Sequence, residues 1–361
     1  KDCKLIFLIG GNPTEAHPIV GLEMKKALRR GCAFIVADPR RIWFAEHAKL
    51  YMPVKPGSDN WLLNAMAHVI IAEGLENKEF IKTRTEDFEE LREFLKDITP
   101  ERASGHTGIP AEDIRQAARL YATSEKSAIY YTLGITEHTC GTDNVRTIAN
   151  LALLTGHIGK PSTGVNPIRG QNNVQGATDV CIPNKMPGYQ DISDNAVMEK
   201  FEKAWGVKLS RTPGATAPTM FERMNKNQFK ALYVIGEDPV ISEPNQDYTL
   251  KGMKNLEFLV VQDIFMSETA KYADVILPAA SFAEKDGTFT NTERRVQRVR
   301  KAINPIGNTK PDWQIICELS NRMGYRMDYP SPKEVYDEIA SLAPMFAGIN
   351  YSRIEHNGIQ W

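Results

Sequence analysis

The sequence predicts an α/β protein with two related domains, each built on a Rossmann-like parallel sheet. Two observations support this fold class: apolar segments of strand length alternate with amphipathic segments of helix length, and one strand–turn–helix–strand unit occurs twice. A length of 361 residues also suits two domains better than one. With 42% hydrophobic residues, the chain can bury a core of ordinary size.

The repeat begins with an apolar strand that ends in a Gly-x-Asn-Pro or Gly-x-Asp-Pro turn. Residues 5–13 align in this way with residues 231–239, and residues 33–38 align with residues 258–263, a second apolar strand that ends in an aspartate. The steps from Asp38 to Ala45, Ala48 and Pro53 recur from Asp263 to Ala270, Ala273 and Pro278. Each copy therefore predicts a parallel βαβ unit with a right-handed crossover. The alternative is one large sheet with a coincidental similarity.

Apolar periodicity predicts the other elements in chain order. We expect strands at residues 51–54, 128–133 and 275–277, and helices at residues 22–30, 62–81, 87–97, 109–122 and 142–155. A stretch rich in Gly, Pro and Asn, residues 155–191, predicts the junction between the domains. We expect a first domain at residues 1–171 and a second at residues 172–361, with a small subdomain near residues 279–312.

Charge and cysteine usage exclude several classes of protein. Lys and Arg total 44 against 45 Asp and Glu, so nothing electrostatic favours nucleic acid or an anionic membrane as a partner. The apolar runs are far shorter than the roughly 20 residues of a membrane span. Five scattered cysteines without a CxxC fit reduced thiols in a cytoplasmic protein, although a protein exported to the periplasm after folding would look the same. Because Lys1 is not a start methionine and no signal peptide follows, we expect the chain to begin within a longer protein.

The turns that end the repeated strands predict two nucleotide sites. A strand that leads into a helix through Gly10-Gly11-Asn12-Pro13 presents backbone N–H groups to a phosphate, and Asp38 at the next strand end can accept hydrogen bonds from a ribose or a base. Two copies imply two nucleotide moieties. Because G-x-G-x-x-G is absent, no motif indicates nicotinamide binding. The alternative is that Asn12 and Asp238 only cap their helices.

A run of amides predicts a polar binding segment at residues 164–176. It contains Asn166, Gln171, Asn172, Asn173 and Gln175 around Arg169, whose planar guanidinium suits a carboxylate or a phosphate. A solvated loop is the alternative. Two further candidates stay open: His138 is either a structural histidine or a proton carrier, and residues 290–295 form either a ligand contact or a hairpin surface.

These residues resemble the large subunit of molybdopterin oxidoreductases, formate dehydrogenases in particular. The resemblance rests on residues 166–176, which read NPIRGQNNVQG, and on residues 37–40, 236–239 and 262–266, and it covers essentially the whole chain. It implies two α/β domains like those of formate dehydrogenase and dimethyl sulfoxide reductase, which form a cleft for a bis(molybdopterin guanine dinucleotide) cofactor with one Mo or W ion. The implied reaction is oxidation of formate to CO2, or its reverse, with transfer of two electrons.

The resemblance also assigns residues. By it, the first dinucleotide would contact Asn12, Glu15, Asp38, Arg40, Lys55, Gly134 and Glu137, and the second would contact Gly236, Asp238, Gln262, Asp263 and Thr269. Arg169 matches the arginine that orients formate, and Gln171 follows it as a cofactor contact. Glu15 and Glu137 stand where relatives often carry Asp and Gln, which puts those two contacts in doubt. His138 would lie outside the reaction itself.

The family's other catalytic parts are not in this sequence. The cysteines of a [4Fe–4S] cluster, a lysine on the electron route and the Cys or selenocysteine metal ligand with its adjacent His would precede Lys1. We therefore expect no metal ligand within the chain and no activity of the chain alone. The expected partners are formate or CO2 and an iron–sulfur electron-transfer subunit, a hydrogenase or an NAD-reducing module. The alternatives are a nitrate or sulfoxide reductase, a metal-free structural subunit of the same fold, and an ordinary dinucleotide dehydrogenase.

Overall fold

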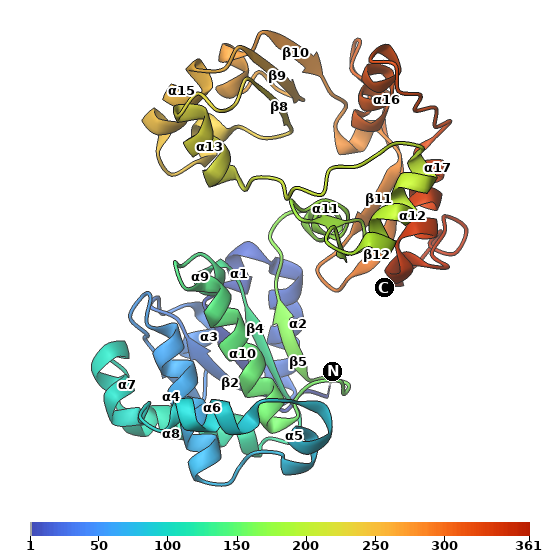
Figure 1. The fold of residues 1–361 in the computed structure, drawn as a ribbon. Coiled ribbons are helices and arrows are strands. Elements are labelled where there is room, and N and C mark those ends of the chain that lie inside the picture. The colour runs from blue at the N-terminus through green and yellow to red at the C-terminus, as the bar shows by residue number, and fades with distance from the viewer. Residues whose placement is uncertain (1) are drawn as a thin grey trace. The chain divides into compact units, whose positions relative to one another are not determined.

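In the computed structural model, which describes residues 2–361, the chain divides into two units between Gly170 and Gln171 (Figure 1). Each unit contains a parallel sheet with helices packed on it, so the expected α/β class is confirmed.

The first unit is built on five strands in the order β3-β2-β1-β4-β5. Their bounds are β1 Leu5–Ile9, β2 Ala33–Ala37, β3 Leu50–Met52, β4 Ser127–Tyr131 and β5 Gly164–Pro167. All four neighbouring pairs are parallel. From β1 the chain winds outward to β3 and then returns to the other side of β1 for β4. The order therefore reverses between β1 and β4, where the carboxyl ends of parallel strands leave a crevice for a ligand.

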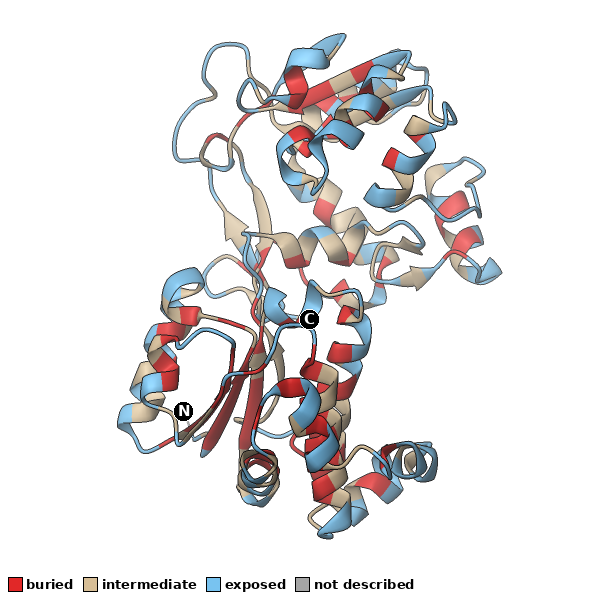
Figure 2. Ribbon diagram, turned by 90° about the vertical axis from the view of Figure 1, so that its left-hand side faces the viewer, coloured by how far each residue is buried: buried red, intermediate tan, exposed pale blue. Residues whose placement is uncertain are grey.

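Helices cover both faces of this sheet. The helices of the unit are α1 Pro13–Ala16, α2 Pro18–Arg29, α3 Trp43–Glu46, α4 Asp59–Ala72, α5 Lys78–Arg84, α6 Phe88–Leu95, α7 Pro100–Thr107, α8 Ala111–Thr123, α9 Leu133–Thr136 and α10 Gly141–Thr155. Along β1, Phe7 and Ile9 join the core formed with α4, α8 and α10, whereas Ile6 and Leu8 join the core formed with α2 and α3. The strand is buried on both sides (Figure 2), which is why its sequence is apolar throughout.

Most predicted elements of the first unit are confirmed within a few residues, but one helix prediction was wrong. Residues 62–81 are not a single helix, because α4 ends at Ala72 and α5 begins at Lys78. Gly74 adopts a φ of +67° between them, a conformation that a helix does not contain. Asn77 then caps α5 by accepting a hydrogen bond from the Phe80 N–H at 3.0 Å. Helix α7 and strand β5 were not predicted.

The second unit contains a three-stranded parallel sheet in the order β10-β9-β8. Its strands β8 Ala231–Ile235, β9 Phe258–Asp263 and β10 Val275–Pro278 pair in the same register as β1, β2 and β3. Leu5 lies opposite Ala33 as Ala231 lies opposite Phe258. The helices around this sheet are α13 Ala217–Asn225, α14 Pro239–Ser242, α15 Gln246–Lys254 and the 3-10 helix η1 Thr269–Tyr272. The internal repeat is therefore a structural duplication.

The rest of the second unit consists of short helices and strands around an antiparallel sheet in the order β11-β12-β13. They are α11 Val174–Val180, β6 Lys185–Met186, β7 Gln190–Asp191, α12 Asn195–Trp205, η2 Phe282–Glu284, β11 Gly287–Thr290, β12 Arg295–Val299, α16 Asp312–Arg322, α17 Pro332–Leu342, η3 Pro344–Phe346 and β13 Ile359–Gln360. Residues 290–295 form the turn between β11 and β12, so the hairpin interpretation is confirmed. The antiparallel sheet takes its third strand, β13, from outside residues 279–312, where a small subdomain was expected.

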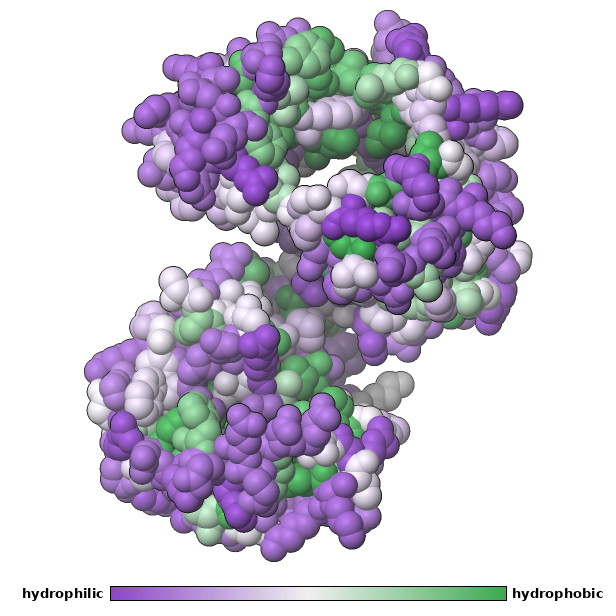
Figure 3. Space-filling view, viewed as in Figure 1, coloured by the Kyte–Doolittle hydropathy of each residue, from purple (hydrophilic) through white to green (hydrophobic). Residues whose placement is uncertain are grey.

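The second sheet is much more exposed than the first. Ile235 is 44% exposed, Phe258 45% and Ile276 40%, whereas every residue of β1 is buried. Figure 3 shows hydrophobic residues gathered over β8–β10. Within residues 2–361, no helix has the length and apolar character needed to cross a membrane.

Candidate functional site

A crevice of about 330 Å³ lies outside the carboxyl ends of β1, β2 and β4, where the strand order reverses. It is lined by Gly10, Gly11, Asn12, Asp38, Pro39, Arg40, Ile42, Val54, Pro56, Asp59, Gly134 and His138. Its volume is at the lower end of the range for small-molecule sites. The structure therefore brings Asn12, Asp38, Arg40 and Gly134 together, although they come from three different parts of the sequence.

Two glycines form the floor of the crevice because their backbones touch. The Gly134 N–H donates to the Gly10 carbonyl oxygen at 3.1 Å, and the Thr132 hydroxyl donates to the same oxygen at 2.7 Å. A Cβ on Gly134 would lie 2.6 Å from that oxygen, and a Cβ on Gly10 would lie 2.7 Å from the Gly134 carbonyl carbon. Gly10 also has a φ of +58°. No side chain fits here, so a ligand meets main chain.

Asp38 forms the acidic wall of the crevice. Its side chain is 8% exposed, and its Oδ1 accepts a hydrogen bond from the Arg40 N–H at 2.8 Å. Burial raises the pKa of Asp38, and the hydrogen bond and charge of Arg40 offset only part of that effect. Arg40 is also paired with Glu15 at 3.5 Å on the exposed rim. A buried carboxylate that lines a crevice can accept hydrogen bonds from ribose hydroxyls or from guanine N–H groups.

Asp59 and His138 complete the crevice, and the sequence interpretation missed Asp59. Asp59 is 3% exposed, and its Oδ2 lies 3.7 Å from the His138 Nε2, which is also 2.9 Å from the Gly134 carbonyl oxygen. Burial raises the pKa of Asp59, and His138 offsets this only in part. The available signal was an acidic residue in the first turn of α4, directly after Gly57-Ser58.

Of the other residues predicted for the first nucleotide, Asn12 lines the crevice, whereas Lys55 and Glu137 lie outside its lining. Asn12 lines the crevice at the start of α1 and accepts a hydrogen bond from the Thr14 hydroxyl at 2.6 Å. Helix α1 spans only four residues and begins with proline, so its dipole is smaller than the sequence suggested. Lys55 is exposed, and its stem lies near Gly108. Glu137 is exposed at the end of α9.

Arg169 follows β5, so it lies on the same edge of the sheet as the crevice. Ile168 before it is buried, and its N–H donates to the Tyr131 carbonyl oxygen at 2.9 Å. The Arg169 carbonyl oxygen lies 3.0 Å from the His17 Nε2. The arginine side chain is exposed and lies close enough to Tyr131 to counter the rise that burial causes in the pKa of that phenol.

The amide-rich segment is neither a solvated loop nor wholly a binding segment. The Asn166 amide donates to the Ile129 carbonyl at 3.1 Å, and the Asn173 Oδ1 accepts from the Thr290 N–H at 2.9 Å. The Gln175 amide donates to the Asp179 Oδ1 at 2.7 Å, and Gln175 is 7% exposed. These three amides hold the fold, whereas Gln171 and Asn172 are exposed at the start of the second unit.

The second copy of the turn repeats the geometry of the first. Gly236 has a φ of +65°, and its N–H donates to the Gln262 carbonyl at 2.8 Å, as the Gly10 N–H donates to the Ala37 carbonyl at 3.0 Å. Helices α1 and α14 both have four residues and both begin with proline. The turn is therefore conserved between the copies as backbone geometry.

The side chains of the second copy are bonded within their own unit. Asp238 accepts hydrogen bonds from the Glu268 N–H, the Thr269 N–H and the Thr269 hydroxyl at 2.9, 2.9 and 2.6 Å. Burial tends to raise the pKa of Asp238, but these hydrogen bonds outweigh it and lower the pKa. Gln262 is fully buried between Tyr233 and Asp312.

Asp263 is the acidic residue of the second copy that stays partly exposed at a strand end. Its Oδ1 accepts a hydrogen bond from the Ile264 N–H at 2.6 Å. Gly236 is also exposed, and a Cβ built on it would meet nothing within 4 Å. Gly236 is therefore exposed and Asp263 partly exposed, whereas Gln262 and Thr269 are buried.

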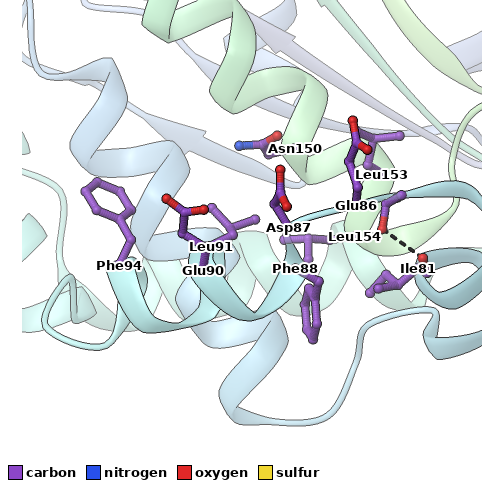
Figure 4. Close-up of a pocket in the computed structure, with 11 residues that line it drawn as sticks. Ile81, Glu86, Asp87, Phe88, Glu90, Leu91, Phe94, Asn150, Leu153 and Leu154 are labelled. Atoms are coloured by element: carbon purple, nitrogen blue, oxygen red, sulfur yellow. Dashed lines mark hydrogen bonds between the residues drawn. The ribbon is translucent and has the colours of Figure 1, made fainter.

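A second cavity in the first unit, of about 360 Å³, does not suit an anionic ligand. Figure 4 shows it between α5, α6 and α10, with Ile81, Leu91 and Leu154 as apolar lining. The carboxylates of Asp87 and Glu90 point towards the side of α10 that carries Asn150 (Figure 4). The lining of this cavity has three carboxylates and no basic residue, whereas the crevice at the strand ends has Arg40 and His138 beside its two carboxylates, so the crevice is the better candidate for an anionic ligand. Across residues 2–361, no group of three or more His, Cys, Asp or Glu residues could hold a metal ion.

Comparisons with known proteins identify the family and the fold. Residues 1–322 match a family model described as molybdopterin oxidoreductase. The chain is 47% identical to the F420-dependent formate dehydrogenase subunit alpha of Methanocaldococcus jannaschii, covering 100% of this chain and 53% of that protein. It is 45% identical to formate dehydrogenase H of Escherichia coli, covering 99% and 50%. A solved structure, acetylene hydratase from Pelobacter acetylenicus, superposes with a TM-score of 0.78 at 25% identity, covering 98% and 51%. The chain thus spans about half the length of these relatives.

Proposed function

This chain belongs to the molybdopterin oxidoreductase family, and on that premise we propose that it is the central part of the catalytic subunit of a formate dehydrogenase. The observation that carries the proposal is the position of Arg169, at the same sheet edge as the crevice between β1 and β4. Acetylene hydratase shares the fold but is named for another reaction, so the fold alone does not decide the chemistry.

In the proposed enzyme, the first unit holds one molybdopterin guanine dinucleotide. The phosphate-bearing part passes close to the backbones of Gly10, Gly11 and Gly134, where the structure has no room for side chains. The Asn12 amide donates or accepts hydrogen bonds with the nucleoside, the Asp38 carboxylate accepts them, and Arg40 contributes a positive charge at the rim. The described residues fit such a group because the cradle is glycine-lined and its buried carboxylates, Asp38 and Asp59, can accept hydrogen bonds. We infer supporting roles for Glu15, Lys55 and Glu137 at the rim.

The second unit holds the other dinucleotide in the same proposal. Gly236 and Asp263 contact the cofactor, because they stay accessible at the strand ends. Asp238, Gln262 and Thr269 shape the turn from within, and Gln171 contributes an amide from the start of the unit. When bound, the cofactor and its Mo or W ion supply the two-electron redox chemistry that these side chains lack.

Arg169 positions the substrate. A guanidinium forms two parallel charge-assisted hydrogen bonds with a carboxylate, so it fixes both oxygens of formate and leaves the C–H bond pointing away from the arginine. The neutral product CO2 loses that charge-assisted pair and can leave. Removal of such a contact commonly costs about 2.7–4 kcal/mol in transition-state stabilisation.

We also propose that electrons leave through a partner, such as an iron–sulfur subunit, a hydrogenase or an NAD-reducing module. Relatives of this chain are named as alpha subunits, which supports a multi-subunit enzyme. The [4Fe–4S] cluster and the metal ligand belong, in this proposal, to the half of the subunit outside these residues. The chain alone should therefore reduce no dye with formate, and turnover by it would refute the assignment of the ligand to the missing half.

A binding experiment tests the cofactor proposal. The chain, and its Asp38→Ala and Asp263→Ala variants, are titrated with GDP, ADP and NAD by calorimetry. We expect two guanine-selective sites, each lost in one variant. Selective binding of NAD would overturn the proposal in favour of a dehydrogenase.

A kinetic experiment tests the substrate. In the full-length subunit we expect Arg169→Lys, in the present numbering, to raise the KM for formate and to lower kcat/KM by about 10²–10³-fold, because lysine cannot make the bidentate pair. Arg29→Lys, the same change at an exposed arginine at the end of α2 and outside the crevice lining, serves as the control. Unchanged formate kinetics in Arg169→Lys, with nitrate or a sulfoxide as the better substrate, would contradict formate as the substrate.

A further inference from the structure

We propose that His17 is a positioning residue that holds the main chain of Arg169 and links it to the first nucleotide turn. The inference rests on the proposed function, because it concerns the arginine assigned to formate. His17 and Arg169 are 152 positions apart in the sequence, yet the His17 Nε2 lies 3.0 Å from the Arg169 carbonyl oxygen.

The geometry sets the tautomer of the ring. A carbonyl oxygen has no proton to give, so the hydrogen bond requires Nε2–H as the donor. The Nδ1 is then the bare nitrogen, and it is buried with no hydrogen-bond partner among the described residues. The ring therefore has one polar contact in the described structure, and that contact is the main chain of Arg169.

The main chain of His17 is itself held by hydrogen bonds to both neighbouring helices. His17 is the single residue between α1 and α2, its N–H donates to the Pro13 carbonyl at 3.2 Å, and its own carbonyl accepts from the Gly21 N–H at 2.8 Å. Helix α2 packs so closely there that a Cβ on Gly21 would lie 2.8 Å from the Pro13 carbonyl oxygen. His17 therefore lies between α1 and α2, and the close contact of these two helices leaves little room for their spacing to change.

The main chain at Arg169 needs such a support. The preceding Ile168 is buried and bonded to Tyr131, but Arg169 and Gly170 are exposed, and a Cβ on Gly170 would meet nothing within 4 Å. A peptide next to an exposed glycine can rotate easily. The hydrogen bond from His17 fixes the carbonyl of Arg169, and so restricts the direction in which its Cα presents the side chain.

His17 also connects Arg169 to the Gly10–Asn12 turn that lines the crevice. Helix α1 begins at Pro13, directly after Asn12 of the crevice lining, and ends one residue before His17. A shift of the Gly10–Asn12 turn when a nucleotide binds is therefore passed through four helical residues to the support of Arg169. Occupancy of the nucleotide site should order the arginine.

The test compares His17→Ala and His17→Gln with His47→Ala in the full-length enzyme. The His47 Nδ1 also contacts a main-chain oxygen, that of Trp43 at 2.9 Å, but it lies on α3's end away from the crevice lining. Loss of one neutral hydrogen bond predicts that His17→Ala raises the KM for formate about 3- to 10-fold, with kcat changed less than about twofold. Glutamine can donate from its amide, so His17→Gln should restore most of the KM. His47→Ala should leave it unchanged.

Two readouts do not depend on turnover. In the 361-residue chain, ¹⁵N spectra of labelled histidine should show the Nε2–H tautomer for His17. Hydrogen exchange of residues 165–171 should be faster in His17→Ala than in His47→Ala, and GDP should slow it in wild type but not in His17→Ala.

The outcomes separate this inference from the proposed function. If Arg169→Lys raises the KM for formate but His17→Ala changes neither the KM nor the exchange, the role of His17 is refuted and the function stands. If Arg169→Lys leaves the KM for formate unchanged, the proposed function is refuted, and the inference that rests on it is refuted as well. An Nδ1–H tautomer for His17 would overturn the inference directly.

Discussion

Gly134→Ala tests whether the touching backbones of Gly10 and Gly134 are required for the crevice. The added Cβ would lie 2.6 Å from the Gly10 carbonyl oxygen and 2.7 Å from its Cα. Ordinary contacts of a Cβ are about 3.5–4.0 Å, so the two strand ends must separate by roughly 1 Å. Both atoms that it meets are main chain directly after the buried strand β1, so the neighbour cannot rotate away as a flexible side chain would.

Two effects of opposite sign decide the magnitude. Overpacking of this kind costs about 1–3 kcal/mol. Replacing glycine by alanine in a helix gains up to about 1 kcal/mol, but α9 has only four residues, so the gain is smaller here. We therefore expect a net loss of about 1–2 kcal/mol in the free energy of unfolding, and weaker GDP binding because the 3.1 Å hydrogen bond between the two backbones is lengthened.

Urea denaturation and GDP titration measure the two effects, with Gly105→Ala as the control. Gly105 lies in α7, and its Cβ would meet nothing within 4 Å, so only the helix-propensity gain remains. Gly105→Ala should raise the free energy of unfolding by about 0.5–1 kcal/mol and leave GDP binding unchanged. If Gly134→Ala is as stable as wild type and binds GDP equally well, the close approach does not shape the site.

Three further predictions concern stability in urea. Because burial raises the pKa of Asp38, its charge costs more in the folded than in the unfolded state, so Asp38→Asn should be more stable than wild type at neutral pH. That gain should disappear as the pH falls through the raised pKa towards the usual 3.8, and a constant gain would contradict the cause. Asp238→Ala should lose about 1.5–3 kcal/mol at neutral pH through its bonds to Thr269, and the loss should shrink as the pH falls below 3.8. Leu154 and Phe94 both line the second cavity, but Leu154 is 2% exposed and Phe94 is 62% exposed. Leu154→Ala should therefore lower the free energy of unfolding by about 2–5 kcal/mol, whereas Phe94→Ala should change it by less than about 1 kcal/mol. Equal losses would show that the α6 side of this cavity is not at the surface.

The strands, the turns and the duplication could be read from the sequence because they depend on residues close together in it. A run of apolar residues such as 5–9 must be buried on both faces of a sheet, and a glycine before Asn-Pro or Asp-Pro supplies the positive φ that both turns use. The family pattern around Arg169 is likewise a continuous segment. These features need no knowledge of the order of strands.

Sequence patterns were less informative about whether each polar residue binds a ligand or stabilises the fold. The amides of residues 164–176 looked equivalent as binding groups, yet Asn173 holds the β11 strand and Gln175 is buried against Asp179. An amide can serve a ligand or a carbonyl of its own chain equally well. Only its neighbours in space decide between the two.

Strand order decided the rest. The contact of Gly10 with Gly134, the enclosure of Asp59 with His138 and the bond from His17 to Arg169 all join residues that are distant in the sequence. They meet because β4 and β5 return to the far side of β1, and local periodicity carries no information on which side of a strand its next neighbour will lie. The sequence thus determined the elements and their chemistry, and the tertiary structure determined which of those groups share one site.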